Sequence, residues 1–221
     1  MLLSGSVTSR LFAALSLIVM ARSVGPPSFG QFVAATTVIR LSSLLFSLGM
    51  DQWLLRNGGQ AWPQATTPAA EIGAIKLLFG IPWLFALTLA LPPINPQMFT
   101  SEIIIRIGLI VWCEELINTI IVGHQATLNV RLASLLTVAP QGLVLLGTLL
   151  VALRTQELSA HLAMRSATMI GCALLAGSIW VWQSRIRVHS SLFLPIIIAS
   201  LPFALSNFLV MLYGTADIVL V

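Results

Sequence analysis

The chain has 221 residues, of which 57% belong to the hydrophobic set and 8% are charged, and its mean hydropathy is +0.98. These values lie far outside the range of soluble domains and predict an integral membrane protein. The formal net charge is +4, but the Lys and Arg residues are dispersed and form no basic stripe, which argues against a nucleic-acid partner. The expected surroundings are therefore the lipid bilayer.

Seven mostly apolar stretches are long enough to cross a hydrocarbon core, which needs about 20 residues in a helix. They lie near residues 3–22, 29–55, 72–91, 102–123, 128–153, 159–182 and 192–221. Clusters of Gly, Pro and polar residues separate several of them, such as SVGPPSFG at 23–30 and LPPINPQMFTSE at 91–102. The sequence predicts an all-α, polytopic membrane protein in which function resides in the helices.

Positive charges in alternate loops predict the orientation of these helices, because cytoplasmic loops are enriched in Lys and Arg. One side receives Arg56, Lys76, Arg131, Arg185 and Arg187, and the other receives Arg22, Arg154 and, near a helix end, Arg165. Five charges against three predict a cytoplasmic N-terminus.

The stretch 29–55 carries a polar stripe. Its members follow steps of four, three, four and four, which keeps them within an arc of about 80° on one continuous helix; they are Thr36, Arg40, Ser43, Ser47 and Asp51. An isolated cation inside a bilayer is costly, so the stripe is expected to face protein or water. It either holds the bundle together through ion pairs and hydrogen bonds, or lines a hydrated substrate path.

The stretch 102–123 places two adjacent carboxylates, Glu114 and Glu115, inside the membrane, with Asn118 on the same face as Glu114. The two carboxylates point about 100° apart on a helix, so at most one of them faces any single partner. Such groups can relay protons or bind cations. Alternatively, one of them pairs with Arg40 or Arg106, although Arg106 can also reach the outer surface.

Charges also occur in the first and last stretches. Arg10 lies inside the first apolar stretch, or at its cytoplasmic end if that helix begins late. In the last stretch, Ser206, Val210, Tyr213 and Asp217 follow helical steps that put them on one face.

Enzyme signatures such as HExxH, GxSxG and CxxC do not occur, and the three histidines are too dispersed to suggest a metal site. Cys113 and Cys172 lie within apolar stretches and are expected to be buried thiols. We therefore expect a protein that is not an enzyme and that uses no cofactor or metal.

Two segments resemble a known family. ARSVGPPSFGQFVAATTVIRLSSLLFSLGMDQWLLR, residues 21–56, resembles the signature of polysaccharide-unit (O-antigen type) flippases, and LPFALSNFLVMLYGTADIVLV, residues 201–221, looks like helix 7 of the same family. The positions that match its motifs are Gly25, Gly30, Gly49, Arg56 and Asp217.

The resemblance implies the multidrug/oligosaccharidyl-lipid/polysaccharide exporter superfamily, whose members have 12 to 14 helices in two six-helix lobes around a central cavity. On that model, residues 1–190 form one six-helix lobe and residues 191–221 the first helix of a truncated second lobe, so the chain is not expected to transport by itself. The location is the bacterial cytoplasmic (inner) membrane.

The expected partner is a polyprenyl-pyrophosphate-linked glycan that is moved to the outer leaflet, together with a possible coupling cation, H⁺ or Na⁺. A cation-coupled multidrug antiporter of the same superfamily is the alternative. The residues predicted to line the path are Arg10, Thr36, Arg40, Ser47, Asp51, Glu114, Asn118 and Asp217.

Overall fold

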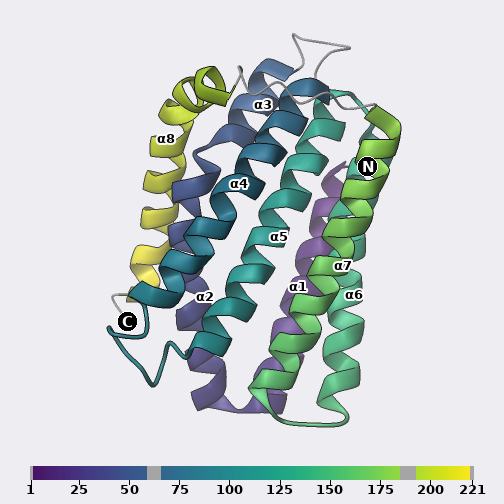
Figure 1. The fold of residues 1–221 in the computed structure, drawn as a ribbon. Helices are drawn as coiled ribbons and strands as arrows, with labels where there is room; N and C mark the ends of the chain where they lie inside the picture. The colour runs from purple at the N-terminus through teal and green to yellow at the C-terminus, as the bar shows by residue number, and fades with distance from the viewer. Residues whose placement is uncertain (1, 59–65, 185–192, 220–221) are drawn as a thin grey trace.

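The computed structural model describes residues 2–58, 66–184 and 193–219, and within these ranges every regular element is a helix. Figure 1 shows long helices that run side by side. They are α1 (Leu2–Val24), α2 (Pro26–Ser47), α3 (Met50–Gly58), α4 (Thr66–Ala90), α5 (Ser101–Ala126), α6 (Val130–Ala152), α7 (Leu158–Ser184) and α8 (Phe193–Val219). The predicted all-α fold is confirmed.

Six helices, α1, α2, α4, α6, α7 and α8, are long and apolar enough to cross a membrane. This supports the prediction of a multi-pass membrane protein. α5 has 26 residues and carries four charged side chains, Glu102, Arg106, Glu114 and Glu115. It is therefore long enough to cross the bundle but unsuited to a lipid-facing position.

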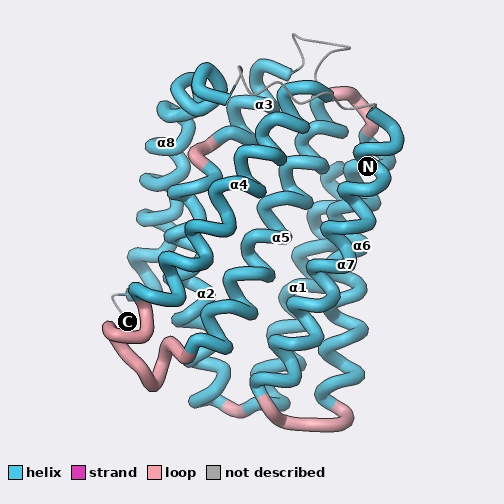
Figure 2. The backbone as a smooth tube through the Cα atoms, viewed as in Figure 1, coloured by secondary structure: helices cyan, strands magenta, loops and turns pink. Residues whose placement is uncertain are grey.

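α5 lies in the middle of the bundle, where it contacts α2, α3, α4, α6 and α7. α1, α6 and α7 pack on one side of it, whereas α2, α3, α4 and α8 form the other side. The described loops lie at the two ends of the bundle, apart from the short turn between α2 and α3 (Figure 2). Side chains from both groups of helices therefore meet around α5.

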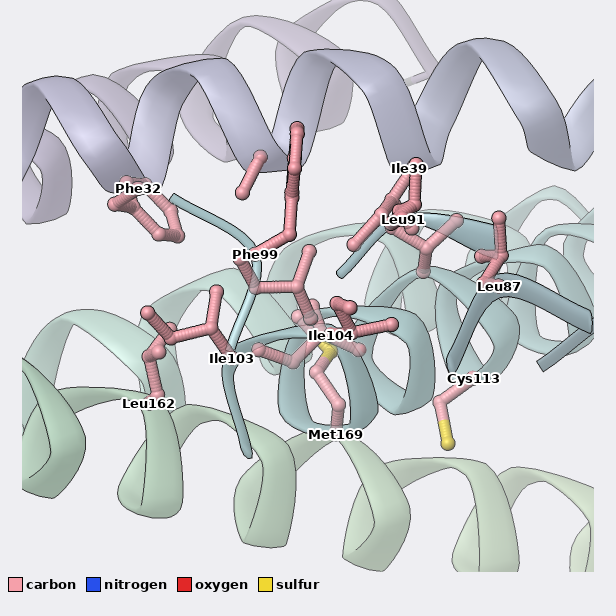
Figure 3. Packing of buried hydrophobic residues seen from close by; sticks show 14 of the residues in the cluster. Phe32, Ile39, Leu87, Leu91, Phe99, Ile103, Ile104, Cys113, Leu162 and Met169 are labelled. Atoms are coloured by element: carbon pink, nitrogen blue, oxygen red, sulfur yellow. The ribbon is translucent and has the colours of Figure 1, made fainter. Parts of the chain in front are cut away.

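Apolar packing joins α2, α5 and α7 through residues that include Phe32, Ile39, Ile104 and Met169 (Figure 3). Ile39 and Ile104 are fully buried. Lipid tails are as apolar as these side chains, so close van der Waals packing stabilises the contact more than exclusion of water does.

The predicted single helix over 29–55 is wrong, because the chain turns between α2 and α3. Leu48 and Gly49 adopt left-handed conformations with φ of 44° and 67°, and the Leu48 N–H closes the end of α2 on the Leu44 carbonyl. Asp51 therefore belongs to the first turn of the nine-residue α3. The five-residue stripe does not lie on one continuous helix, because the turn places Asp51 on a different helix from the other four residues.

Gly49 is required at this turn for two reasons. Its positive φ disfavours any side chain, and a Cβ built there would lie 2.5 Å from the Ala204 backbone nitrogen on α8. We expect Gly49→Ala to lower the free energy of unfolding by about 2 kcal/mol or more, measured by denaturant unfolding in detergent. Gly30→Ala is the matched control, because a Cβ there meets nothing within 4 Å. Equal stability of the two variants would contradict this account.

Lys76 does not lie in an aqueous loop, where the charge count placed it. α4 begins at Thr66, earlier than predicted, because Pro68 falls in the first turn, where a helix tolerates proline. Lys76 is consequently inside the helix and fully buried. Arg165 is likewise two turns inside α7 and buried. Without these two residues the charge difference between the sides is four against two, and the cytoplasmic N-terminus stays a prediction.

Candidate functional site

The two adjacent carboxylates of α5 point to different helices, as their 100° separation predicts. Glu114 forms an ion pair with Arg40 of α2. Glu115 instead accepts a hydrogen bond from Lys76 of α4, at 2.9 Å between Nζ and Oε2. One helix therefore serves two separate groups of charges inside the bundle.

The first group, which we call the lysine cluster, consists of Lys76, Asp51, Glu115, Asn118 and Thr119. The Lys76 ammonium donates to Asp51 Oδ2 at 2.8 Å, to Glu115 Oε2 at 2.9 Å and to the Glu115 carbonyl at 3.3 Å. These three bonds use all three of its N–H groups. A fully buried ammonium is thus completely satisfied by protein.

Asp51 is equally well satisfied. Besides the Lys76 ammonium, the Asn118 amide donates to its Oδ2 at 2.6 Å and the Thr119 hydroxyl to its Oδ1 at 2.8 Å. The Glu115 carboxylate accepts from Lys76 alone among the described residues, and the Glu115 side chain is 26% exposed, against 8% for Asp51. Protein donors therefore fill the acceptors of Asp51, while the Glu115 carboxylate keeps free acceptor capacity and access to small ions.

Two carboxylates and one ammonium give the lysine cluster a formal net charge of −1. Desolvating such groups is costly, and their attraction compensates only when every donor and acceptor is matched. The matched donors converge on Asp51, which leaves Glu115 as the carboxylate with unused acceptors in the cluster.

The second group, which we call the arginine cluster, consists of Arg40, Glu114 and Arg165. The Arg40 side chain is 47% exposed even though it lies inside the predicted membrane span of α2. Arg165 of α7 is 9% exposed and acts electrostatically on Glu114. Two cations around one carboxylate give the arginine cluster a formal net charge of +1, and Arg40 is its exposed member.

The Arg165 guanidinium lacks an ion pair of its own within the described residues. Its Cζ lies 5.5 Å from the centre of the Phe32 ring, and its Nη1 lies 3.5 Å from the Met20 sulfur. Both contacts are weak beside a guanidinium–carboxylate pair. The guanidinium therefore keeps donors for an anion.

The other predicted path residues lie apart from these clusters or outside the described residues. Ser47 is buried in α2, and the buried Thr36 hydroxyl has no hydrogen-bond partner within the described residues. Arg10 is exposed on α1 and joins neither cluster. The Asp217 side chain lies outside the described part of the chain, so its predicted role is untested.

Sequence reasoning missed Lys76 and Arg165 because it counted Lys76 among the loop charges and placed Arg165 near a helix end. The available signal was that each lies within a stretch that the sequence itself marks as apolar, 72–91 and 159–182.

The structure also decides between the two alternative partners predicted for the central carboxylates, Arg40 and Arg106. Arg106 pairs with Glu102 at 2.9 Å, one turn away on α5, and leaves Glu114 to Arg40.

A separate cavity of about 980 Å³ lies between α4, α5 and α7. Its α5 wall includes Leu116, which lies about 200° around the helix from Glu114. Apart from Thr119, the residues of the two charged clusters do not line it. The cavity is an apolar feature on the opposite side of α5 from the arginine cluster.

The comparisons with known proteins leave the family unassigned. The chain matches no model of a known protein family, no curated protein and no solved structure. Within the described residues, no group of three or more His, Cys, Asp or Glu side chains is arranged to hold a metal ion. Function must therefore be argued from the two charged clusters.

Proposed function

We propose that the chain forms one helical lobe of a bacterial inner-membrane transporter that moves polyprenyl-pyrophosphate-linked oligosaccharides. The arginine cluster binds the pyrophosphate, and the bundle guides it across the bilayer. The resemblance of residues 21–56 and 201–221 to flippases suggests the substrate class. The net positive charge of the arginine cluster, with its exposed Arg40, is the physical reason to expect an anionic substrate.

The half-exposed Arg40 is the observation that carries the proposal. A side chain this exposed within an apolar span is expensive in lipid unless water or an anion meets it. Its partner Glu114 neutralises one cation, and Arg165 adds a second with unused donors. Guanidinium groups match phosphate geometry with two parallel hydrogen bonds. A diphosphate inside the membrane would therefore find a matched site.

Binding to the purified chain tests this proposal. In nanodiscs, undecaprenyl pyrophosphate is expected to bind, whereas the neutral alcohol undecaprenol is not. Arg40→Gln is expected to weaken pyrophosphate binding by about 2–3 kcal/mol, a roughly 30- to 150-fold rise in Kd. Surface plasmon resonance or microscale thermophoresis measures the difference.

Arg10→Gln is the matched control, because Arg10 is also an arginine within an apolar helix but belongs to neither cluster. It should leave the Kd unchanged. Equal binding of undecaprenol would show that the chain binds through its apolar surface, and an equal loss in both variants would show that the arginine cluster is not a specific site. The proposal would then be abandoned.

A second candidate function is a cation-coupled multidrug antiporter, and the lysine cluster favours it. Its net charge of −1 and the single partner of Glu115 suit uptake of H⁺ or Na⁺. The two candidates differ in cargo, since a drug antiporter would bind organic cations such as ethidium at carboxylates. Ethidium binding that is lost in Glu115→Gln and insensitive to Arg40→Gln would favour the antiporter.

A further inference from the structure

The short helix α3 lies between the lysine cluster and α8. It contacts α4, α5 and α8, and in Figure 1 it stands beside α8 at the end of the bundle where α2 ends. We propose that α3 couples the charge of Glu115 to the position of α8. This inference concerns movement within the chain and does not depend on the substrate proposed above.

The side of α3 that faces α4 and α5 is tightly held. Asp51 binds Lys76, Asn118 and Thr119, as described above, and Met50 and Leu54 are fully buried. A shift of the Lys76 ammonium is therefore transmitted directly to the first turn of α3 through Asp51.

The contact of α3 with α8 is equally close. Gly49, which begins the turn into α3, lies so near the α8 backbone that a Cβ there would be 2.5 Å from the Ala204 nitrogen and 2.7 Å from the Phe203 carbonyl carbon. The Arg56 guanidinium lies 5.9 Å from the centre of the Phe203 ring. α8 thus contacts α3 near both ends of α3, at Gly49 and at Arg56.

α8 is also suited to bending at this contact. Pro202 lies inside the helix, directly before Phe203, and proline removes one backbone hydrogen bond of the helix and often produces a kink. On the other side, the turn at Leu48 and Gly49 separates α3 from α2. α3 therefore follows a turn at its N-terminal end and packs against α8, a helix that can bend at Pro202.

The cause of the movement is a proton that passes from water to a Glu115 oxygen. Neutral Glu115 attracts Lys76 less, so the ammonium moves toward Asp51, the remaining carboxylate in the cluster. The charged groups that face this part of α5 are Lys76 from α4, Asp51 from α3, Arg40 from α2 and Arg165 from α7, with Glu114 on α5 itself. Glu71 is buried on α4, and the described side chains of α8, residues 193–210, carry no charge.

Distance measurement between spin labels tests the coupling. Labels at Leu205 of α8 and Leu150 of α6 occupy exposed positions, and a second pair at Leu78 of α4 and Leu150 reports the rest of the bundle. Cys113 and Cys172 are replaced by alanine in every sample. Glu115→Gln is expected to shift the Leu205–Leu150 distance by about 2 Å or more and to leave the Leu78–Leu150 distance unchanged.

Glu114→Gln is the matched control, since it removes the same charge one residue away from the lysine cluster. Its Leu205–Leu150 distance should equal that of the parent protein. In the parent, acidification should reproduce the shift seen in Glu115→Gln. Identical distances in Glu115→Gln and Glu114→Gln would overturn the proposal.

A further variant tests the route through α3. Phe203→Ala removes the ring that Arg56 contacts, so combining it with Glu115→Gln should reduce the shift of α8. A full shift in the combined variant would show that the movement does not pass through this contact, and circular dichroism confirms that each variant remains helical.

Discussion

Lys76→Met is expected to lower the free energy of unfolding by about 3–5 kcal/mol, because it leaves the buried Asp51 and the partly buried Glu115 without their shared cation. The Lys76 side chain has 0% exposure, so the protein shields it from both lipid and water. Methionine fills most of the same volume, so the loss measures charge rather than packing. Denaturant unfolding in detergent, followed by circular dichroism, gives the free energy.

Two comparisons separate this effect from a general sensitivity to charge removal. Arg106→Met breaks the exposed Glu102–Arg106 pair and should cost less than about 1 kcal/mol. The triple variant Asp51→Asn, Lys76→Met and Glu115→Gln removes all three charges together and should recover most of the loss. If the triple variant were as unstable as Lys76→Met alone, the cluster would stabilise the fold through packing, and the electrostatic account would be wrong.

The sequence predicted the helices and the central charges better than it predicted their pairing. Apolar stretches report helix existence directly, and the two adjacent glutamates were placed correctly on separate faces of α5. The partner of Glu115 could not be predicted in this way, because it depends on how α4 is rotated against α5. The position of Asp51 could not be predicted either, because it depends on a turn at Leu48, and leucine seldom adopts a positive φ.

The error at Lys76 has a physical cause that applies to other membrane sequences. The predicted stretch 72–91 begins after Pro68, but in the first helical turn the missing N–H of a proline costs nothing. The helix therefore begins earlier, and a cation that looked peripheral lies inside the bundle. A lysine or arginine within a turn or two of a proline-containing helix start deserves to be counted as an intramembrane charge.

Arg165→Met is expected to have the opposite profile to Lys76→Met. Because the Arg165 guanidinium has only the Phe32 ring and the Met20 sulfur as close partners among the described residues, the free energy of unfolding should stay within about 1 kcal/mol of the parent value. Binding of undecaprenyl pyrophosphate should weaken by about 2–5 kcal/mol, a Kd increase of roughly 30- to several-thousand-fold.

This contrast distinguishes a charge kept for binding from one kept for structure. Arg165→Lys retains the cation but not the planar fork, so it should recover part of the affinity and leave the stability unchanged. If Arg165→Met instead unfolded as readily as Lys76→Met while it kept its affinity for pyrophosphate, the guanidinium would be a structural group. Glu114 with Arg40 would then be the whole of the exposed site, with no net positive charge, and the physical reason for an anionic cargo would be lost.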